Sequence, residues 1–524
     1  MSAQLSVQVA ALAGRARRVM DRVGDERLFG LCLLGLAVAI AVFLVAPLTP
    51  GFAAMHHLPT NRDIHVEGKD QGGVTGFWVL SSLSFLLALW RWRQGGRPSW
   101  RLLLAGAVLL HLLAMLVPPV ASEDVYAYSF YGAVQRDYGT NPYLAFPDQH
   151  PLHPWFPFWS WRDIGPVYGP PFLLMLRGVA VLAGPSLLAW VIWMKVLLVA
   201  AEAAGIWALV RAMRPVPGSD QPPPQAPGWP VLLLAWNPMV LQSIAMSAHV
   251  DALLLLLVGL AALAHRRRRF LAAFLLLAGC FVIKLYMGPL AALYAIWLAM
   301  RREPGRRLAE LARLAGLGTL VTVAAYLPYA SAGTDILTSV MSVGEHFSSG
   351  SAGNIVRRAL TVVLQWGGMS QTGATGLGDR AGRLLAMGAV LAWLALCALR
   401  MYRRAEQRPE EDPLPALASY FLGYLLLTPW VLYWHEIPLL ALVAAIPWSL
   451  TSLVAILFGL TLMPSTAGGR AGVGAAPADT RELLNTVSAF VSRYGAPLAM
   501  LLGGWWLGRR KPKDQADERV TSRR

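Results

Sequence analysis

Long apolar runs, separated by short clusters of arginine, constrain this chain more than any other feature of its sequence. The run 102–117 is typical, being rich in leucine, alanine and valine. A helix needs about 20 such residues to cross a lipid bilayer. Inside the bilayer a helix satisfies its own backbone hydrogen bonds. The sequence therefore predicts an all-α polytopic membrane protein.

Composition supports that prediction. Hydrophobic residues make up 56% of the chain and charged residues 14%, whereas soluble proteins carry about 25% charged residues. With about 20 residues for each crossing, the 524 residues accommodate about ten to fourteen crossings. No long soluble domain remains once the apolar runs are assigned.

The basic residues indicate how the chain is oriented. Its formal net charge is +16, and most of its 45 lysines and arginines lie in clusters between apolar runs. These clusters fall within 15–27, 91–101, 211–214, 266–269, 301–313 and 400–408, and after Gly508. Cytoplasmic loops are enriched in Lys and Arg, so we place the clusters, with the N-terminus, in the cytoplasm. Nucleic-acid binding is not needed to explain the charge.

Cysteines and the N-terminal segment suggest no secreted domain. Cys32, Cys280 and Cys397 all lie in apolar runs without CxxC spacing, which predicts packing residues rather than disulfides or a zinc site. The basic segment 1–27 leads into a full-length apolar run, as in an uncleaved signal anchor. The sequence therefore predicts that the first apolar run stays in the membrane as an anchor.

Counting crossings from the cytoplasmic N-terminus places two adjacent carboxylates outside. The run 28–47 would lead out, 74–90 back and 102–117 out again, which brings Glu123 and Asp124 to the extracytoplasmic face. They open an aromatic outer loop, about 118–171. A second outer loop is expected at about 328–383.

The same count places polar residues from five loops on that face: Glu123, Asp124, Arg162, Asp163, His249, Asp251, Lys284, Glu345, His346, Arg357, Arg358, His435 and Glu436. Such a set can form an active site, with a carboxylate as base and cations for a phosphate. The alternative is that any polytopic protein divides its polar loop residues between two faces. Asp251 could instead cap a helix.

Basic residues outside the cytoplasmic clusters leave further alternatives open. Arg357 and Arg358 could bind an anionic headgroup, cap a helix end or contact anionic lipid. Lys195 and Glu202 lie within one apolar run, where ionisable residues are often functional, but a paired or snorkelling lysine explains them equally. There is no HExxH motif or His/Cys cluster, so a metal signal is weak and a divalent metal remains open.

A series of short motifs resembles a known family. The motifs are Asp124-Val-Tyr126, Gly139-Thr-Asn141-Pro142-Tyr143, Tyr168-Gly169-Pro170, Asn237-Pro238, His249-Val-Asp251, Lys284 and Pro429-Trp430. In their order and spacing the chain resembles the GT-C superfamily of polyprenyl-phosphate-sugar-dependent glycosyltransferases, and most closely the bacterial α-1,6-mannopyranosyltransferases of lipoglycan assembly. The resemblance implies a GT-C-like bundle of about 11–14 transmembrane helices with two large extracytoplasmic loops.

The resemblance also implies roles for individual residues. Asp124 would deprotonate the acceptor hydroxyl, with Glu123 as the second candidate. The donor phosphate and the substrates would contact residues of the other outer loops, for which the candidates are Lys284, His249, Asp251, Arg357, Arg358, Tyr126, Tyr168, Arg162 and His435. The implied partners are a polyprenyl-phosphate sugar donor, a lipid or glycan acceptor and membrane lipids.

We therefore expect a cytoplasmic segment 1–27, a transmembrane glycosyltransferase domain 28–508 and a cytoplasmic tail 509–524. The expected reaction moves a sugar, with inversion, from the donor to an acceptor hydroxyl at the extracytoplasmic face. Mannose is favoured by the resemblance, although glucose and arabinose donors carry the same phosphate lipid. The alternative functions are a transporter or flippase for a lipid-linked or anionic solute, with Lys195 and Glu202 on its path, and a non-catalytic scaffold.

Overall fold

A computed structural model describes residues 24–45, 71–119, 122, 124–159, 162, 165–215, 224–341, 347–348, 351–462 and 478–509. Within these ranges the chain is helical and has no strand. The prediction of an all-α protein is confirmed.

The described residues form a succession of α-helices along the chain. They are α2 (Asp25–Ile40), α4 (Gln71–Arg93), α5 (Trp100–Met115), α6 (Asp124–Asp137), α7 (Pro170–Ala183), α8 (Leu187–Ala212), α9 (Pro238–Leu241), α10 (Asp251–Arg266), α11 (Phe270–Ile283), α12 (Gly288–Met300), α13 (Arg307–Tyr326), α14 (Asp335–Met341), α15 (Ala352–Trp366), α16 (Gln371–Gln407), α17 (Leu414–Leu427), α18 (Ile437–Ala444), α19 (Leu450–Leu462) and α20 (Ala478–Arg509).

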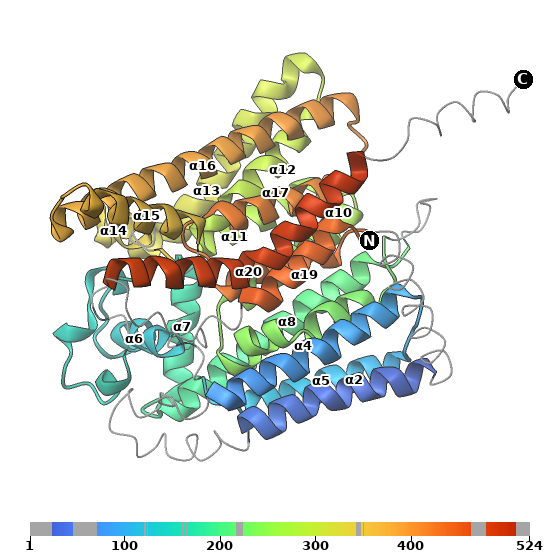
Figure 1. Ribbon diagram of the computed structural model, residues 1–524, viewed down its shortest axis with the longest axis horizontal. Helices are drawn as coiled ribbons and strands as arrows, with labels where there is room; N and C mark the ends of the chain where they lie inside the picture. Colours follow the sequence, from blue (N-terminus) through green and yellow to red (C-terminus); the bar gives the residue numbers. More distant parts are fainter. Residues whose placement is uncertain are drawn as a thin grey trace, which may run out of the picture.

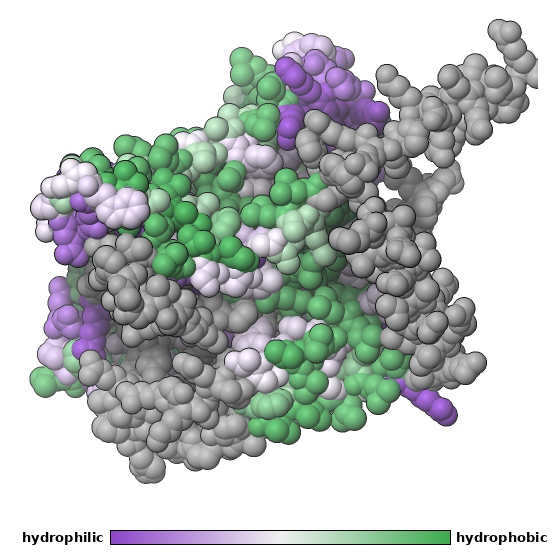
Figure 2. Space-filling view, in the orientation of Figure 1, coloured by the Kyte–Doolittle hydropathy of each residue, from purple (hydrophilic) through white to green (hydrophobic). Residues whose placement is uncertain are grey.

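The helices form one bundle with α6 and α7 at one end (Figure 1). Helices α2, α4, α5 and α8 lie in its lower part as drawn, and α13, α15 and α16 lie in its upper part. Helix α10 packs against α8 on one side and against α11 and α18 on the other, and so joins the two parts. Figure 2 shows apolar residues over much of the visible face, with hydrophilic residues gathered at the projecting α12–α13 connection.

Several helices are long and apolar enough to cross a membrane. Among the described residues four qualify, namely 25–43, 187–212, 304–332 and 371–407. A fifth crossing results if the pair 238–246 and 251–266, bent by 119°, is one span, and six shorter apolar helices accompany them. The chain is therefore a multi-pass membrane protein, whereas the total of 11–14 crossings stays a prediction.

Two segments depart from a simple pattern of apolar crossings and open loops. The apolar run from Val231 is not one continuous helix, because it is broken at Asn237-Pro238, where proline lacks an N–H for the helix. The Asn237 side chain accepts a hydrogen bond from Met239 N at 2.9 Å and so starts α9. The expected outer loop 328–383 is largely helical, because it contains α14, α15 and the start of α16.

Two further connections shape the bundle. Helices α11 and α12 form a tight pair around Lys284. A break near Pro447 separates α18 from α19. Cys32, Cys280 and Cys397 are free and buried, which confirms them as packing residues.

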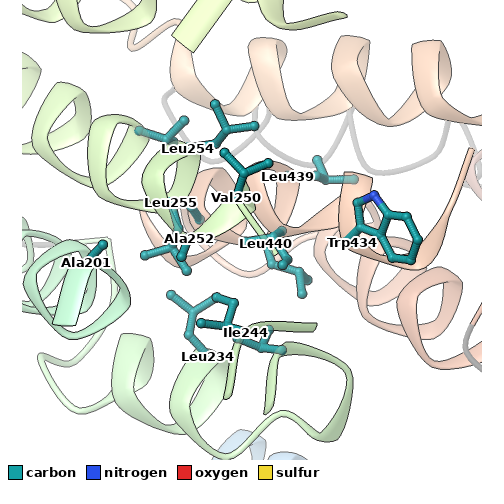
Figure 3. Close-up of a cluster of buried hydrophobic side chains, with 14 of the residues drawn as sticks. Ala201, Leu234, Ile244, Val250, Ala252, Leu254, Leu255, Trp434, Leu439 and Leu440 are labelled. Atoms are coloured by element: carbon teal, nitrogen blue, oxygen red, sulfur yellow. The ribbon is translucent and has the colours of Figure 1, made fainter. Parts of the chain in front are cut away.

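An apolar core is formed where α8, α10 and α18 meet two π-helical segments, η6 (Val231–Ala235) and η7 (Gln242–Met246). Figure 3 shows its apolar side chains, including Ala201, Leu255 and Leu440, which point toward one another from these elements. Buried apolar side chains of this kind hold helices in register through close packing.

Glycines allow α8 and α10 to touch through their backbones. A Cβ added at Gly259 would lie 2.6 Å from the carbonyl oxygen of Gly205, and a Cβ added at Gly205 would lie 2.9 Å from the Cα of Leu256. Small residues at such crossings permit the close approach on which helix association in membranes depends. This contact fixes α10, and with it Asp251, relative to α8.

We predict that Gly259→Ala destabilises the protein by about 1–3 kcal/mol, because the added methyl group forces two backbones apart. The matched control is Gly316→Ala in α13, where a Cβ would meet nothing within 4 Å and alanine favours the helix. The measurement is the thermal unfolding midpoint of the purified protein in detergent. Equal midpoints for the two variants would contradict the close contact.

Candidate active site

Asp124 opens α6 at the end of the bundle. The Ser122 hydroxyl accepts a hydrogen bond from the backbone N–H of Asp124 at 3.2 Å, and a carboxylate suits the positive end of a helix. The residue is only 8% exposed. Helix α6 packs against α7 and α8 and is buried over most of its length, so the position of Asp124 is rigidly defined.

Two tyrosines and a histidine surround the Asp124 carboxylate. The hydroxyls of Tyr128 and Tyr168 each lie 3.3 Å from its Oδ2 atom and 3.2 Å from one another. His249 Nδ1 lies 3.5 Å from the same oxygen, without hydrogen-bond geometry. Burial raises the pKa of Asp124 above its ordinary value, and the nearby Lys284 ammonium opposes that rise. The carboxylate is therefore poised to accept a proton more readily than an exposed aspartate.

Lys284 brings a positive charge to the same place. It ends α11 and is 6% exposed. Its Nζ atom donates to Asp251 Oδ2 at 2.7 Å, and the Tyr286 hydroxyl donates to Asp251 Oδ1 at 3.0 Å. Both oxygens of Asp251 are thus satisfied by side chains, so Asp251 acts as the partner of Lys284 rather than as a side-chain cap of α10. One of the three ammonium hydrogens is used here, which leaves others for a ligand.

The Tyr168-Gly169-Pro170 motif joins Asp124 to Lys284. Gly169 N donates to the Ile283 carbonyl at 3.0 Å, and a Cβ at Gly169 would lie 1.6 Å from the carbonyl oxygen of Val282. Only glycine permits this approach. It places Tyr168 beside the residue that follows Ile283, and the Lys284 Nζ atom lies 5.6 Å from the centre of the Tyr168 ring.

The Gly139-Thr-Asn141-Pro142-Tyr143 motif supports Tyr168 from the other side. Gly139 has a φ of +63°, which favours glycine, and turns the chain after α6. Asn141 donates to the Tyr329 carbonyl at 3.1 Å and to the Ser331 hydroxyl at 3.0 Å. Tyr143 donates its hydroxyl to the Tyr168 carbonyl at 2.7 Å. The motif therefore fastens the aromatic loop to the bundle next to the site.

The short helix η12 (Tyr433–Glu436) contributes an imidazole. His435 Nδ1 accepts a hydrogen bond from Leu432 N at 3.2 Å, so the neutral ring carries its proton on Nε2. Burial lowers the pKa of His435 well below its ordinary value, and Lys284 adds to this effect. His435 therefore presents an N–H donor that carries no charge.

His249 takes a different place from the other candidates. It is fully buried and stacks on Trp434, with ring centres 3.8 Å apart. It does not line the cavity described below. Figure 3 places Trp434 at the edge of the apolar core, so His249 lies between that core and Asp124.

A cavity of about 680 Å³ opens beside these residues. Its polar end is formed by Asp124, Tyr168, Lys284, Tyr286 and His435. Its other walls are mainly apolar and include Val390, Leu391 and Leu394 of α16 and Leu425 of α17. Leu391 is 60% exposed on the outer face of the bundle. The cavity therefore leads from a charged end to the apolar surface.

The structure does not bring every sequence candidate to this cavity. Arg357 pairs with Asp379 at 2.9 Å and joins α15 to α16. Arg162 donates to the carbonyls of Trp159 and Phe156, both at 3.2 Å, within its own loop. Neither these residues nor Arg358 and Tyr126 line the cavity.

Five further residues belong to the polar set that the sequence places on the outer face. Glu436, the last residue of η12, is fully buried beside Gly459 of α19 and does not line the cavity. The remaining four, Glu123, Asp163, Glu345 and His346, lie outside the described residues.

Lys195 and Glu202, assigned to the transporter alternative, lie elsewhere. Lys195 donates to the carbonyls of Met115, at 3.1 Å, and Val117 at the end of α5. Glu202 lies 3.1 Å from His111 Nε2. Neither residue lines the cavity at Asp124.

Sequence reasoning missed several residues of the site. Tyr128 lies one helical turn after Asp124, so its proximity could have been inferred from helical periodicity. Tyr286 and Trp434 gave no such signal, because they join the site through tertiary packing. Among the described residues, no three or more His, Cys, Asp or Glu side chains gather as a metal-binding group.

Comparison with known proteins identifies the family. Residues 32–301 match the family described as "Alpha-(1->6)-mannopyranosyltransferase, N-terminal domain", a range that includes Asp124, Tyr168, Asp251 and Lys284. The chain is also 26% identical over 250 residues to Alpha-(1->6)-mannopyranosyltransferase A of Mycobacterium tuberculosis (strain ATCC 25618 / H37Rv). That alignment spans 46% of this chain and 44% of the relative. Because the family match covers more than half of the sequence, this multi-pass membrane protein belongs to the alpha-(1->6)-mannopyranosyltransferase family.

Proposed function

We propose that this protein transfers a mannosyl residue from a polyprenyl-phosphate donor to a hydroxyl of a lipid-linked or glycan acceptor. The observation that carries the proposal is the cavity with a carboxylate and an ammonium at one end and apolar walls that reach the surface. A polyprenyl-phosphate sugar has the same division, because its sugar and phosphate are polar and its chain is apolar. The choice of mannose rests on the family and on the relative's name.

Apolar walls favour a lipid donor over a nucleotide sugar. Leu285 and Pro289, before and within α12, line the cavity together with Val390, Leu391 and Leu394 of α16. Burial of a prenyl chain there would contribute about 25 cal/mol for each Å² of apolar surface removed from water. The exposed side of Leu391 leaves room for the rest of the chain to continue into the membrane.

Asp124 is the proposed general base. In this reaction the acceptor oxygen attacks the anomeric carbon and its proton passes to the Asp124 carboxylate. The bond between the anomeric carbon and the phosphate oxygen breaks, and polyprenyl phosphate leaves with the electron pair. Attack opposite the leaving group inverts the configuration at the anomeric carbon. The raised pKa of Asp124 suits the transfer of a proton to this carboxylate.

Lys284 and His435 are the proposed donors to the leaving phosphate. Both line the polar end of the cavity. Charge-assisted hydrogen bonds from an ammonium are the stronger kind, and the Nε2–H of His435 adds a neutral donor. Asp251 and Tyr286 hold the ammonium in place. Tyr168 lies against both Asp124 and Lys284 and is proposed to contact the sugar.

The proposed topology places this site at the extracytoplasmic face of the inner (plasma) membrane. Asp124 follows α5, whose first residues adjoin the arginine cluster 91–101, and cytoplasmic loops are enriched in such clusters. The transmembrane glycosyltransferase domain would span 28–508, between the basic segments 1–27 and 509–524. The donor would then approach from the outer leaflet.

We predict that Asp124→Asn lowers the transfer rate about 10²- to 10⁴-fold, the usual contribution of a general base, without loss of folding. The matched control is Asp148→Asn, an exposed aspartate in the same outer loop. The measurement is transfer of radiolabelled mannose from polyprenyl-phosphate mannose to a membrane lipid extract by the purified protein. Wild-type transfer by Asp124→Asn would remove Asp124 from the mechanism, whereas transfer from another polyprenyl-phosphate sugar alone would correct the donor.

The pH dependence of transfer tests the state of the base. Burial raises the pKa of Asp124, so on acidification the carboxylate gains a proton, and the rate falls, at a higher pH than for an exposed aspartate. We predict an acid limb in kcat/KM above pH 3.8, the ordinary value, with the rate rising as pH increases through it. A rate that stays constant down to the ordinary pKa would contradict a buried base.

Gly169 contributes no side chain to the site and is expected to affect transfer only by allowing the close backbone contact with Val282. We predict that Gly169→Ala lowers transfer at least tenfold, because a Cβ there meets the Val282 carbonyl and separates Tyr168 from Lys284. The control is Gly178→Ala in α7, where a Cβ has open space. Measuring transfer and the thermal midpoint for both variants separates a displaced site from general instability. Full activity of Gly169→Ala would show that this contact does not position the site.

A further inference from the structure

A second cavity, of about 540 Å³, lies between α5 and α8. Each helix presents one stripe to it at helical spacing. The α5 stripe includes Leu104, Val108 and Leu112, and the α8 stripe includes Ala203 and Ile206. Both helices pack on η6, whose Val231 and Ala235 also line the cavity. The cavity is therefore a groove between two helices, with a floor supplied by a third segment.

One end of this groove is basic. Arg211 and Arg214 line it near the end of α8, and neither has a carboxylate partner among the described residues. The Arg211 guanidinium lies 5.6 Å from the centre of the Trp207 ring. Trp100 lines the same end from α5. Tryptophan beside arginine is typical of the membrane–water interface, where lipid headgroups lie.

The rest of the groove is apolar and open to its surroundings. Val108 and Leu112 are each 59% exposed. At the far end, Met115 and Val199 complete the walls, and the contact between His111 and Glu202 joins α5 to α8. Glu202 therefore has His111 as its ionic partner, whereas Arg211 and Arg214 line the groove without a carboxylate partner in the described part of the chain.

The groove is distinct from the proposed active site. Near the start of α8, Trp190 donates to the Val125 carbonyl beside Asp124 at 3.0 Å. Arg211 and Arg214 lie at the opposite end of this helix. Arg211 is 21 residues after Trp190, about 32 Å along the axis at 1.5 Å per residue. In Figure 1, α8 runs from the side of α6 and α7 toward the other side of the bundle. A ligand at the arginines therefore belongs to the other membrane leaflet.

We propose that this groove binds one anionic phospholipid, with its phosphate between Arg211 and Arg214 and an acyl chain along the α5 and α8 stripes. A free phosphate would use the arginines and leave the apolar stripes uncovered. A zwitterionic lipid would bring a cationic group beside two unpaired arginines. An anionic phospholipid satisfies both ends, and each arginine near the headgroup contributes about a five-fold preference for the anionic lipid.

Native mass spectrometry of the full chain tests this proposal. The protein is reconstituted with vesicles of equimolar phosphatidylglycerol and phosphatidylcholine, extracted in mild detergent and weighed with its retained lipid. The variants are Arg211→Gln with Arg214→Gln, and Ala203→Trp, which fills the groove and keeps the arginines. The matched control is Arg267→Gln with Arg269→Gln, an equal loss of charge at the exposed α10–α11 connection.

The wild type and the control should each retain one phosphatidylglycerol in preference to phosphatidylcholine. The double arginine variant should lose that preference at least tenfold, and Ala203→Trp should lose the bound lipid. Equal retention of the two lipids by the wild type, or unchanged retention in the double variant, would overturn the proposal. Unchanged lipid retention by Ala203→Trp would show that the lipid binds outside the groove. The same measurement on protein extracted directly from native membranes would contradict a phospholipid occupant if it recovered polyprenyl phosphate instead.

Discussion

The candidate active site depends on holding a buried carboxylate, that of Asp124, near a buried ammonium, that of Lys284. Charges cost several kcal/mol to bury unless partners compensate them, and here Asp251 and Tyr286 hold Lys284 while tyrosine hydroxyls surround Asp124. These groups come from α6, α10, the loop before α7 and the short connection between α11 and α12. The contact of Gly259 with Gly205 and that of Gly169 with Val282 are needed because they bring those elements within reach.

The cavity at Asp124 and Lys284 also connects these charged groups to the apolar outside of the bundle. It joins them to the apolar surface of α16. This is the arrangement on which the proposed polyprenyl-phosphate donor rests. Lys195 and Glu202, in contrast, hold α5 against α8. They support the segment that leads to Asp124, and the second groove runs beside them with its basic end at the opposite end of α8.

Much of this could be predicted from the sequence. The apolar runs predict an all-α membrane protein. The series of motifs predicts that Asp124, Tyr168, Asp251 and Lys284 belong to one site, and in the structure these four residues lie together. The sequence offers Arg357 as a phosphate candidate, but it does not predict the pairing of Arg357 with Asp379. That pairing depends on how α15 crosses α16, which sequence spacing does not specify. The role of Gly169 also required the structure, because its close contact is with the distant α11. Helix breaks such as Asn237-Pro238 follow from local chemistry and could have been predicted more sharply.

A structure of the protein with a non-transferable phosphonate analogue of polyprenyl-phosphate mannose tests the central claim most directly. The account predicts phosphonate oxygens about 2.7–2.9 Å from Lys284 Nζ, the usual length of a charge-assisted hydrogen bond. It also predicts the sugar beside Asp124 and the prenyl chain along Leu391 and Leu394. An analogue bound away from this cavity, or bound with its chain at Lys284 and its sugar remote from Asp124, would contradict the account.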